Sequence, residues 1–474
     1  VLYVARNRQS GTPDNIAGLF SAVPTELIMR RYLYFFALLL LAQVSLAEQT
    51  AFINVNVVPM SSDAVIEQQT VIVDRGVIEA IGPVDDIPIP KGATVVDGTD
   101  RYLMPGLAEM HAHVPDAGSK DLDRYFSLYV ANGVTTIRGM LGRASHLDLR
   151  QNLLDGDVFG PRLVTSGPSL NGRSVSNASH ARQLVEEQHA AGYDFIKVHP
   201  GLSSAEFEAL AETANSLDMP FAGHVPVAAG VQRALELNMA TIDHLDGYFA
   251  ALLPPSSDGS GGYGGFFDVL LADELDADRI AEIARATAAA GTWNVPTEIL
   301  IEQYVNDVPV AELRNRSEMR YMPKETVQRW ADSKAETLAE SGFDSRVAAL
   351  AIDVRRRLIL ELQRAGAGLL LGSDSPQVFN VPGFATHREL DALVAAGLTP
   401  YEALYSGTVA VADFLGSNTG IVAVGREADL VLVNANPLTD IGNSHRIHGV
   451  MLRGKWYSAA ALERRLAPYR AADE

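Results

Sequence analysis

Cysteine is absent from the 474 residues of the chain, so neither a disulfide framework nor a lipid-attachment cysteine is available. Basic residues are also few: 38 Lys and Arg stand against 58 Asp and Glu, which gives a formal charge of −20. Nucleic acids and anionic membrane surfaces require clustered Lys and Arg, so this balance argues against both partners. What the composition does provide, 47% hydrophobic and 20% charged residues, is typical of a globular protein with a large core.

Long hydrophobic runs are missing except near the N-terminus, where the pattern is that of a signal peptide. Met29-Arg30-Arg31 is basic, Tyr32 to Ala42 is apolar, and Ser45-Leu46-Ala47 offers small residues for cleavage before Glu48. A membrane anchor is the alternative, but the run is shorter than the roughly 20 residues that span a bilayer. We therefore expect residues 29–47 to be a signal peptide and residues 1–28 to lie upstream of the native start. The mature protein would be secreted or periplasmic, with no stable membrane anchor.

Short strands separated by turns occupy both ends of the remaining chain. Residues 51–55 read AFINV and residues 70–73 read TVIV, and the same pattern returns in ADLVLV at 428–433 and GVMLRGK at 449–455. We expect residues 48–104 and 419–474 to form one small β-sandwich domain, with a second domain over residues 105–418.

The middle of the chain alternates strands and helices, as parallel βαβ units do. Helices are expected over residues 203–217 and 227–237, and Ser203 with Glu206 has the spacing of a capping box. A series of eight βα units closes most naturally as a (β/α)8 TIM barrel, with an open doubly wound sheet as the alternative. The predicted fold class is therefore α/β. The expected strands are Gly106–His113, Val134–Arg138, Arg162–Ser166, Phe195–His199, Phe221–His224, Thr241–Leu245, Thr292–Pro296 and Gly368–Gly372.

A Gly/Ser-rich segment, PPSSDGSGGYGG at residues 254–265, follows the sixth expected strand. A flexible surface loop is the favoured interpretation. A lid over the site is the alternative, because loops at that end of a barrel border the active centre.

Six polar residues fall at the carboxyl ends of the expected strands. His111 and His113 lie two apart on one strand, so both imidazoles project to the same side and can reach one metal ion. Taken singly, each residue has a structural explanation, such as a lysine reaching solvent, a hydrogen-bonded histidine or an aspartate that caps a turn. Together they occupy the positions where barrel enzymes place catalytic groups. The set is His111, His113, Lys197, His224, His244 and Asp374.

The order HxH, Lys, His, His and Asp resembles that of the amidohydrolase superfamily. The neighbouring words resemble its imidazolonepropionase-like branch, which includes Xaa-Pro dipeptidase-type enzymes. These words are YLMPGLAEMHAHV, GYDFIKVHPGL, PFAGHVP, ATIDHLDGY, PGFATHRELDALVAAGLTPYEAL and GREADLVLVNANPL, and the resemblance runs from about Ala51 to about Ser458. It indicates the fold and the metal chemistry more strongly than the substrate, because one fold hosts many reactions.

The resemblance implies two divalent metal ions, with zinc the expected metal. The implied ligands are His111, His113 and Asp374 for the first ion, His224 and His244 for the second, and Lys197, carboxylated by CO₂, as the bridge. A mononuclear site is the alternative if Lys197 is unmodified. Asp374 would also orient the metal-bound hydroxide and take its proton for the leaving group.

Two further residues are candidate substrate contacts. His199 stands two residues after Lys197, where related sequences often have Tyr; a hydrogen-bonding role behind the ligands is the favoured interpretation, with substrate contact or metal ligation as alternatives. Tyr248 follows His244 by four residues and is a weaker candidate. No catalytic role is expected for His180, His189, His387, His445 and His448.

The implied reaction is hydrolysis of an amide bond in a small peptide or an N-acyl amino acid, with that small molecule as the partner. A lactone or phosphoester hydrolase on the same site is the alternative within this fold. A non-catalytic binding protein is a third possibility, which the complete ligand set disfavours. The sequence is compatible with a homo-oligomer and leaves the substrate and the metal identity open.

Overall fold

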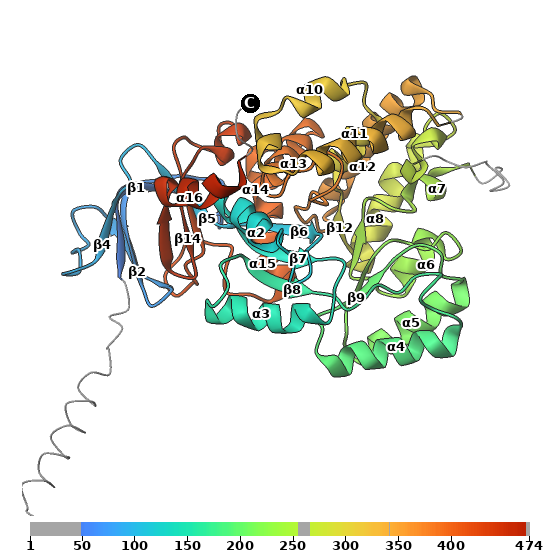
Figure 1. Ribbon diagram of the computed structural model, residues 1–474, viewed down its shortest axis with the longest axis horizontal. Helices are drawn as coiled ribbons and strands as arrows, with labels where there is room; N and C mark the ends of the chain where they lie inside the picture. The colour runs from blue at the N-terminus through green and yellow to red at the C-terminus, as the bar shows by residue number, and fades with distance from the viewer. Residues whose placement is uncertain (1–48, 255–265, 341, 471–474) are drawn as a thin grey trace, which may run out of the picture. The chain divides into compact units, whose positions relative to one another are not determined.

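The computed structural model describes residues 49–254, 266–340 and 342–470, which form an α/β fold (Figure 1). The α/β class is thereby confirmed. The expected signal peptide and residues 1–28 lie outside the described residues, as does residue range 255–265 of the Gly-rich segment. Residues from Glu48 onward group as one compact unit. Within the described ranges, no helix is both long and apolar enough to cross a membrane.

Strands from both ends of the chain share one eight-stranded sheet with the order β15-β14-β13-β5-β1-β2-β3. This sheet forks at β1, which pairs with β4 through residues 50–53 and with β5 through residues 56–57. The two ends of the chain meet where β13 runs antiparallel to β5, and Figure 1 shows blue and dark-red strands side by side. The strands are β1 (Thr50–Val57), β2 (Ile66–Asp74), β3 (Val77–Pro83), β4 (Thr94–Asp97), β5 (Tyr102–Pro105), β13 (Leu430–Val433), β14 (Ile447–Leu452) and β15 (Lys455–Ser458).

Seven of the eight strands expected in the middle of the chain are present, all parallel and in chain order. They form two sheets, β6-β7-β8 and β12-β11-β10-β9, without the reversal of strand order that a doubly wound sheet requires. Parallel bridges from Ser166 to Phe195 and from Leu170 to Val198 link the segment that follows β8 to β9 and so join the two sheets. The strands are β6 (Leu107–Ala112), β7 (Val134–Gly139), β8 (Arg162–Thr165), β9 (Ile196–Val198), β10 (Phe221–Gly223), β11 (Thr241–Asp243) and β12 (Trp293–Val295).

The eighth expected strand, residues 368–372, is not a continuous strand, and that expectation is wrong. Its backbone makes isolated bridges instead, from Leu369 to β12 and from Ser375 to β6. Regular pairing is interrupted because the backbone nitrogen of Leu371 donates to the carbonyl of Ser406, at the end of α14, instead of to a neighbouring strand. Asp374 then takes a left-handed φ of 57°, which is incompatible with an extended strand. The segment nevertheless keeps its place between β12 and β6.

Helices follow most of the parallel strands. Ser203 and Glu206 form the predicted capping box at the start of α5, which confirms that expectation. The helix expected over residues 227–237 begins later, because the carbonyl of Pro226 accepts hydrogen bonds from Ala229 and Gly230 in a turn. The helices are α2 (Leu122–Ala131), α3 (Ser145–Asp155), α4 (Ala178–Ala191), α5 (Ser204–Ser216), α6 (Gly230–Glu236), α7 (Tyr248–Leu252), α8 (Ile280–Ala290), α9 (Glu298–Val305), α10 (Val310–Arg314), α11 (Lys324–Leu338), α12 (Ser345–Ala365), α13 (Phe384–Ala395), α14 (Pro400–Ser406), α15 (Val409–Leu415) and α16 (Ala459–Leu466).

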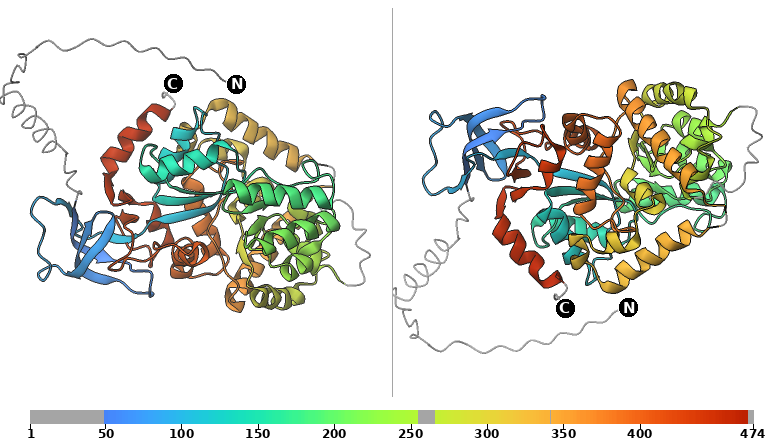
Figure 2. Two further views of the ribbon diagram at one scale, coloured as in Figure 1. Left: turned by 90° about the horizontal axis from the view of Figure 1, so that it is seen from below. Right: turned by 90° about the horizontal axis from the view of Figure 1, so that it is seen from above.

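The parallel strands lie inside the helices, as the two views of Figure 2 show. The largest buried apolar cluster combines strand residues such as Ile137, Ile196 and Ile242 with helix residues such as Phe207 and Leu358. Because the strands are parallel, their carboxyl ends meet on one side, and the residues that follow them are brought together.

Candidate metal centre

Three of the predicted ligands are grouped closely enough to hold one metal ion. The ligand atoms of His111, His113 and Asp374 all lie within 4.8 Å of one another. Nε2 of His113 is 2.8 Å from Oδ1 of Asp374, and Nε2 of His111 is 3.8 Å from the same oxygen. His111 is 1% exposed and Asp374 5% exposed. Two imidazoles and a carboxylate from β6 and the segment after residue 372 thus converge at one point.

The imidazoles of the predicted second site continue this group. His244, which follows β11, lies 4.5 Å from His111 between ring centroids, and His224, which follows β10, lies 4.7 Å from His244. His199 stacks on His224 at 5.0 Å, with an angle of 28° between the rings. Since His113 lies 5.8 Å from His111, the five rings form one continuous arc across the carboxyl ends of four strands.

The Nδ1 atoms of three of these imidazoles lie close to neighbouring oxygens. Nδ1 of His111 is 2.8 Å from Oδ2 of Asp243, a close contact without hydrogen-bonding geometry. Nδ1 of His224 is 3.1 Å from Oδ2 of Asp246, and Nδ1 of His244 is 2.8 Å from Oγ1 of Thr297. Metal-binding histidines in proteins are held in this way by the nitrogen that faces away from the ion. Nε2 of each ring is left as the free donor.

Lys197 is buried without a hydrogen-bonding partner for its amine. Its side chain is 1% exposed, and the carboxylate of Asp243 is 3.9 Å from Nζ, beyond hydrogen-bonding distance. Burial lowers the pKa of Lys197 to about 8, against the opposing effect of the nearby aspartates. Gly223 makes room for this side chain, because a β-carbon there would lie 2.8 Å from Cδ of Lys197. A buried lysine with an unpartnered amine is unusual for a purely structural residue.

Protonation of the site follows from burial and from the mutual contacts of its residues. Burial lowers the pKa of His111 and His244 well below the ordinary value, so both rings are neutral and able to donate a lone pair to a metal. Burial alone would raise the pKa of Asp374, but His111, His113 and Lys197 outweigh it and lower that pKa. Neutral imidazoles beside an ionised carboxylate are a donor set that suits zinc and similar divalent ions.

Glu109, which was not predicted as part of the site, joins β6 to the segment that carries Asp374. It is fully buried; Oε1 accepts from the backbone nitrogens of His111 and Ser373, and Oε2 accepts from the hydroxyls of Ser373 and Thr386. Burial raises the pKa of Glu109 to about 7. An acidic residue inside the otherwise apolar run LAEM, just before His111, was the available sequence signal.

Asp243 and Arg138 are two further residues that sequence reasoning missed. The guanidinium of Arg138 on β7 is buried; it donates to the carbonyl of Met110, to Oγ1 of Thr241 and to Asp243. Asp243 is in turn the carboxylate beside Nδ1 of His111. The word TIDHLDGY contains both Asp243 and Asp246, so acidic residues flanking a ligand histidine were the signal.

Strained backbone conformations occur at the site. His244 and Thr297, which form a hydrogen bond with each other, have left-handed φ values of 64° and 46°. Arg355 on α12 donates to the carbonyls of His244 and Pro296 at 2.8 and 3.0 Å and pairs with Glu298. Such conformations cost of order 1–3 kcal/mol each and persist where surrounding contacts hold them.

The two predicted substrate contacts differ in their surroundings. His199 lines a cavity of about 640 Å³ next to the arc of imidazoles. Tyr248 is fully buried; its hydroxyl lies 2.8 Å from Oδ1 of Asn294 and 3.0 Å from Oγ1 of Thr287. The hydroxyl of Tyr248 is thus hydrogen-bonded within the core. Substrate contact by Tyr248 stays a prediction without structural support.

A second cavity, of about 430 Å³, lies at the amino ends of the strands rather than at the carboxyl ends. Its lining includes Thr136, Arg162 and Phe195 from the starts of β7, β8 and β9, together with residues of α15. None of the predicted site residues lines it. Although this cavity is better enclosed, the residue types of the carboxyl-end group make that group the candidate site.

Residues 102–457 match the model of the amidohydrolase family. This stretch is most of the chain, so the chain belongs to the amidohydrolase family and is an enzyme of the amidohydrolase type. The family predicted from the sequence is thereby confirmed.

Three similar proteins carry more specific names. An imidazolonepropionase of Idiomarina loihiensis is 39% identical over 70 residues, and this match covers 14% of the chain and only 17% of that protein. The structure of a bottromycin amidohydrolase is 22% identical with a TM-score of 0.68, covering 89% of this chain and 90% of that one. A Xaa-Pro dipeptidase with methionine bound in its active site is 18% identical with a TM-score of 0.61, covering 87% and 100%. At these identities the two structures demonstrate a shared fold.

Proposed function

We propose that the protein is a metal-dependent hydrolase that cleaves an amide bond in a small peptide or an N-acyl amino acid. The arrangement that supports this proposal is the group of His111, His113 and Asp374 with ligand atoms within 4.8 Å of one another. His244 and His224 extend the group at 4.5 and 4.7 Å between successive rings. Solitary structural histidines would not be arranged in this way.

In the proposed centre, two divalent ions, zinc or similar, are held by separate parts of the group. His111, His113 and Asp374 would hold the first ion, and His224 and His244 the second. The hydrogen bonds of Asp246 and Thr297 with Nδ1 of His224 and His244 support this assignment, because they leave Nε2 as the donor. Asp243 also approaches Nδ1 of His111, at 2.8 Å. Bound ions of this kind polarise a scissile carbonyl and acidify water.

Lys197 is proposed to bridge the two ions as a carbamate. Only a neutral amine reacts with CO₂, and burial favours that form by lowering the pKa of Lys197. The amine nitrogen would form a bond to the CO₂ carbon and release one proton to solvent. The resulting carboxylate replaces a positive charge with a negative one, which suits a position between two cations.

Asp374 is proposed to act as the general base and then as the general acid. An ionised carboxylate can accept a proton from the attacking water and pass it to the amide nitrogen as the carbon–nitrogen bond breaks. Its neighbours lower its pKa and so favour the ionised form that the first step needs. Glu109 would position this residue by accepting the Ser373 backbone nitrogen at 2.7 Å.

The proposal also includes the domain organisation, the location and the partners of the protein. The two parallel sheets and the bridges of the 368–375 segment support a closed (β/α)8 barrel over residues 105–418. The shared terminal sheet supports an accessory β-domain from residues 48–104 and 419–474. We also propose export to the periplasm or the exterior after removal of residues 29–47, a small-molecule substrate and no nucleic-acid partner.

The test is a substrate screen with metal analysis of the purified protein. We expect about two equivalents of zinc or a similar ion per chain, and turnover of dipeptides or N-acyl amino acids that a chelator abolishes and added metal restores. If lactones or phosphotriesters are turned over faster than amides, the proposed substrate class becomes that of the faster compound. Active protein without bound metal would overturn the proposal as a whole.

A further inference from the structure

The cavity beside His199 is built by a turn that is attached to the strand of Lys197. Leu170 donates its backbone nitrogen to the carbonyl of Lys197 at 2.9 Å, and its own carbonyl accepts the nitrogen of His199 at 2.8 Å. The residues after Leu170 line the cavity together with His199. The turn is therefore held in register with the strand that ends at the proposed metal centre.

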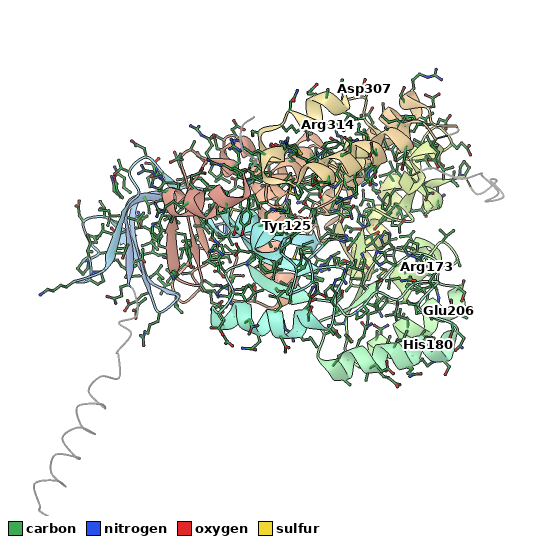
Figure 3. All side chains as sticks on the ribbon, viewed as in Figure 1. Tyr125, Arg173, His180, Glu206, Asp307 and Arg314 are labelled. Atoms are coloured by element: carbon green, nitrogen blue, oxygen red, sulfur yellow. The ribbon has the colours of Figure 1, made fainter. Side chains whose placement is uncertain are left out.

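Hydrogen bonds within the turn fix the backbone of Arg173. Oδ1 of Asn171 accepts the backbone nitrogens of Arg173 and Ser174 at 2.9 and 3.1 Å. Gly172 approaches the exit of β9 so closely that a β-carbon there would lie 2.3 Å from the carbonyl oxygen of Gly201. Arg173 is thus presented from a rigid turn, and Figure 3 shows it in the part of the molecule built by α4, α5 and α6.

Arg173 is the permanent positive charge of this cavity. The lining contains no Asp or Glu, and within the described residues no carboxylate pairs with the Arg173 side chain. Nδ1 of His199 is buried without a hydrogen-bonding partner in the described structure. An uncompensated guanidinium beside an unpartnered imidazole nitrogen is a binding arrangement for an anion.

The position of the cavity relative to the proposed metal centre indicates which anion it would bind. His199 stacks on His224 at 5.0 Å, so the cavity begins one residue away from the proposed ligands. In an N-acyl amino acid or a dipeptide, the free carboxylate is separated from the scissile carbonyl only by the amide nitrogen and one carbon. A carboxylate anchor must therefore adjoin the metal centre, as this cavity does.

We propose that Arg173, with His199 beside it, forms a subsite that binds the free carboxylate of the substrate and selects N-acyl amino acids and dipeptides over uncharged amides. This inference rests on the proposed function and adds the residue that recognises the leaving amino acid. Arg173 is a specificity residue in this scheme, and bond cleavage does not require it.

The test compares N-acetyl-L-alanine with N-acetyl-L-alaninamide, which differ only in this carboxylate. For Arg173→Gln we expect kcat/KM to fall about 30-fold on the acid and to change less than about 3-fold on the amide, the loss expected for a hydrogen bond to a charged group. Arg173→Lys should recover part of the loss because it keeps the charge. Arg182→Gln, an exposed arginine on α4, is the matched control and should leave both substrates unchanged.

Calorimetric binding in an Asp374→Asn background separates this inference from the proposed function. We expect the acid to bind more tightly than the amide, and Arg173→Gln to remove that preference. If the acid and the amide bind with equal affinity, and Arg173→Gln changes neither affinity, the subsite is wrong even if the enzyme cleaves both compounds. Preferential, Arg173-dependent binding without turnover by the unsubstituted protein would support the subsite and reject the proposed hydrolysis.

Discussion

The two halves of the proposed metal centre differ in how completely the protein organises them. On the first side, His111, His113 and Asp374 already have their ligand atoms within 4.8 Å of one another, and Glu109 links β6 to the segment before Asp374 by hydrogen bonds. On the second side, His224 and His244 are oriented, but Lys197 has an unpartnered amine 3.9 Å from the nearest carboxylate. The first half is thus ready to bind one ion, whereas the second half needs a further ligand, which carboxylation of Lys197 would provide.

Asp374→Asn should have the largest effect on activity, because it removes the base from the first half while keeping a ligand oxygen. We expect kcat to fall about a thousandfold, the upper part of the range for a lost general base, with much of the bound metal retained. Metal analysis and steady-state kinetics on one preparation provide the measurement. Asp429→Asn is the control: this buried aspartate directly precedes β13 and pairs with Arg162 on β8, so its replacement should affect stability alone.

Lys197→Ala should separate the two halves most clearly. Without the bridge, we expect metal content to drop from about two to about one equivalent and activity to fall about a hundredfold. Acetate or propionate in excess should restore part of the rate by filling the gap, whereas Lys197→Arg should resist rescue because its guanidinium keeps the positive charge there. Near-normal turnover and two bound metals in Lys197→Ala would show that no bridge exists.

Lys334 offers a matched control for that experiment. It is also a fully buried lysine, but its Nζ donates to the carbonyls of Gln303 and Asn306. Lys334→Ala should therefore destabilise the fold without any rescue by acetate. Rescue of both variants would indicate a general salt effect instead of a filled ligand position.

Gly223→Ala tests whether the second half depends on the space around Lys197. Gly223 has a φ of +120°, and a β-carbon would lie 2.6 Å from the carbonyl oxygen of Val198 and 2.8 Å from Cδ of Lys197. We expect a loss of about 1–3 kcal/mol in stability and selective loss of the second metal. Gly192→Ala measures the effect of backbone strain without the steric contact, because Gly192 has a φ of +84° and no atom lies within 4 Å of a β-carbon there. Equal metal loss in both variants would contradict a steric role for Gly223.

Local sequence patterns indicate the positions of the proposed ligands more readily than the contacts around them. HxH at the end of β6 and single histidines after β10 and β11 follow from strand periodicity, which is a local property. Glu109 bonds to Ser373, and Arg138 bonds to Asp243, across 264 and 105 residues of chain. No local pattern predicts such pairs, because they depend on which strands become neighbours. The interrupted strand before Asp374 was missed for the same reason, since its backbone nitrogen at Leu371 donates to the distant Ser406.

Tyr248→Phe should have the smallest effect, and it tests whether the second half extends along α7 to the substrate. The hydroxyl of Tyr248 is fully buried between Asn294 and Thr287. Its removal should lower the free energy of unfolding by about 1 kcal/mol, the usual contribution of one hydrogen bond. Because no atom of the proposed centre contacts that hydroxyl in the described structure, kcat and KM should stay within about 2-fold of their original values. Thermal unfolding and kinetics on the same sample provide both numbers. A tenfold rise in KM with unchanged stability would instead make Tyr248 a substrate contact and would place the substrate deeper in the second half than Arg173 and His199 indicate.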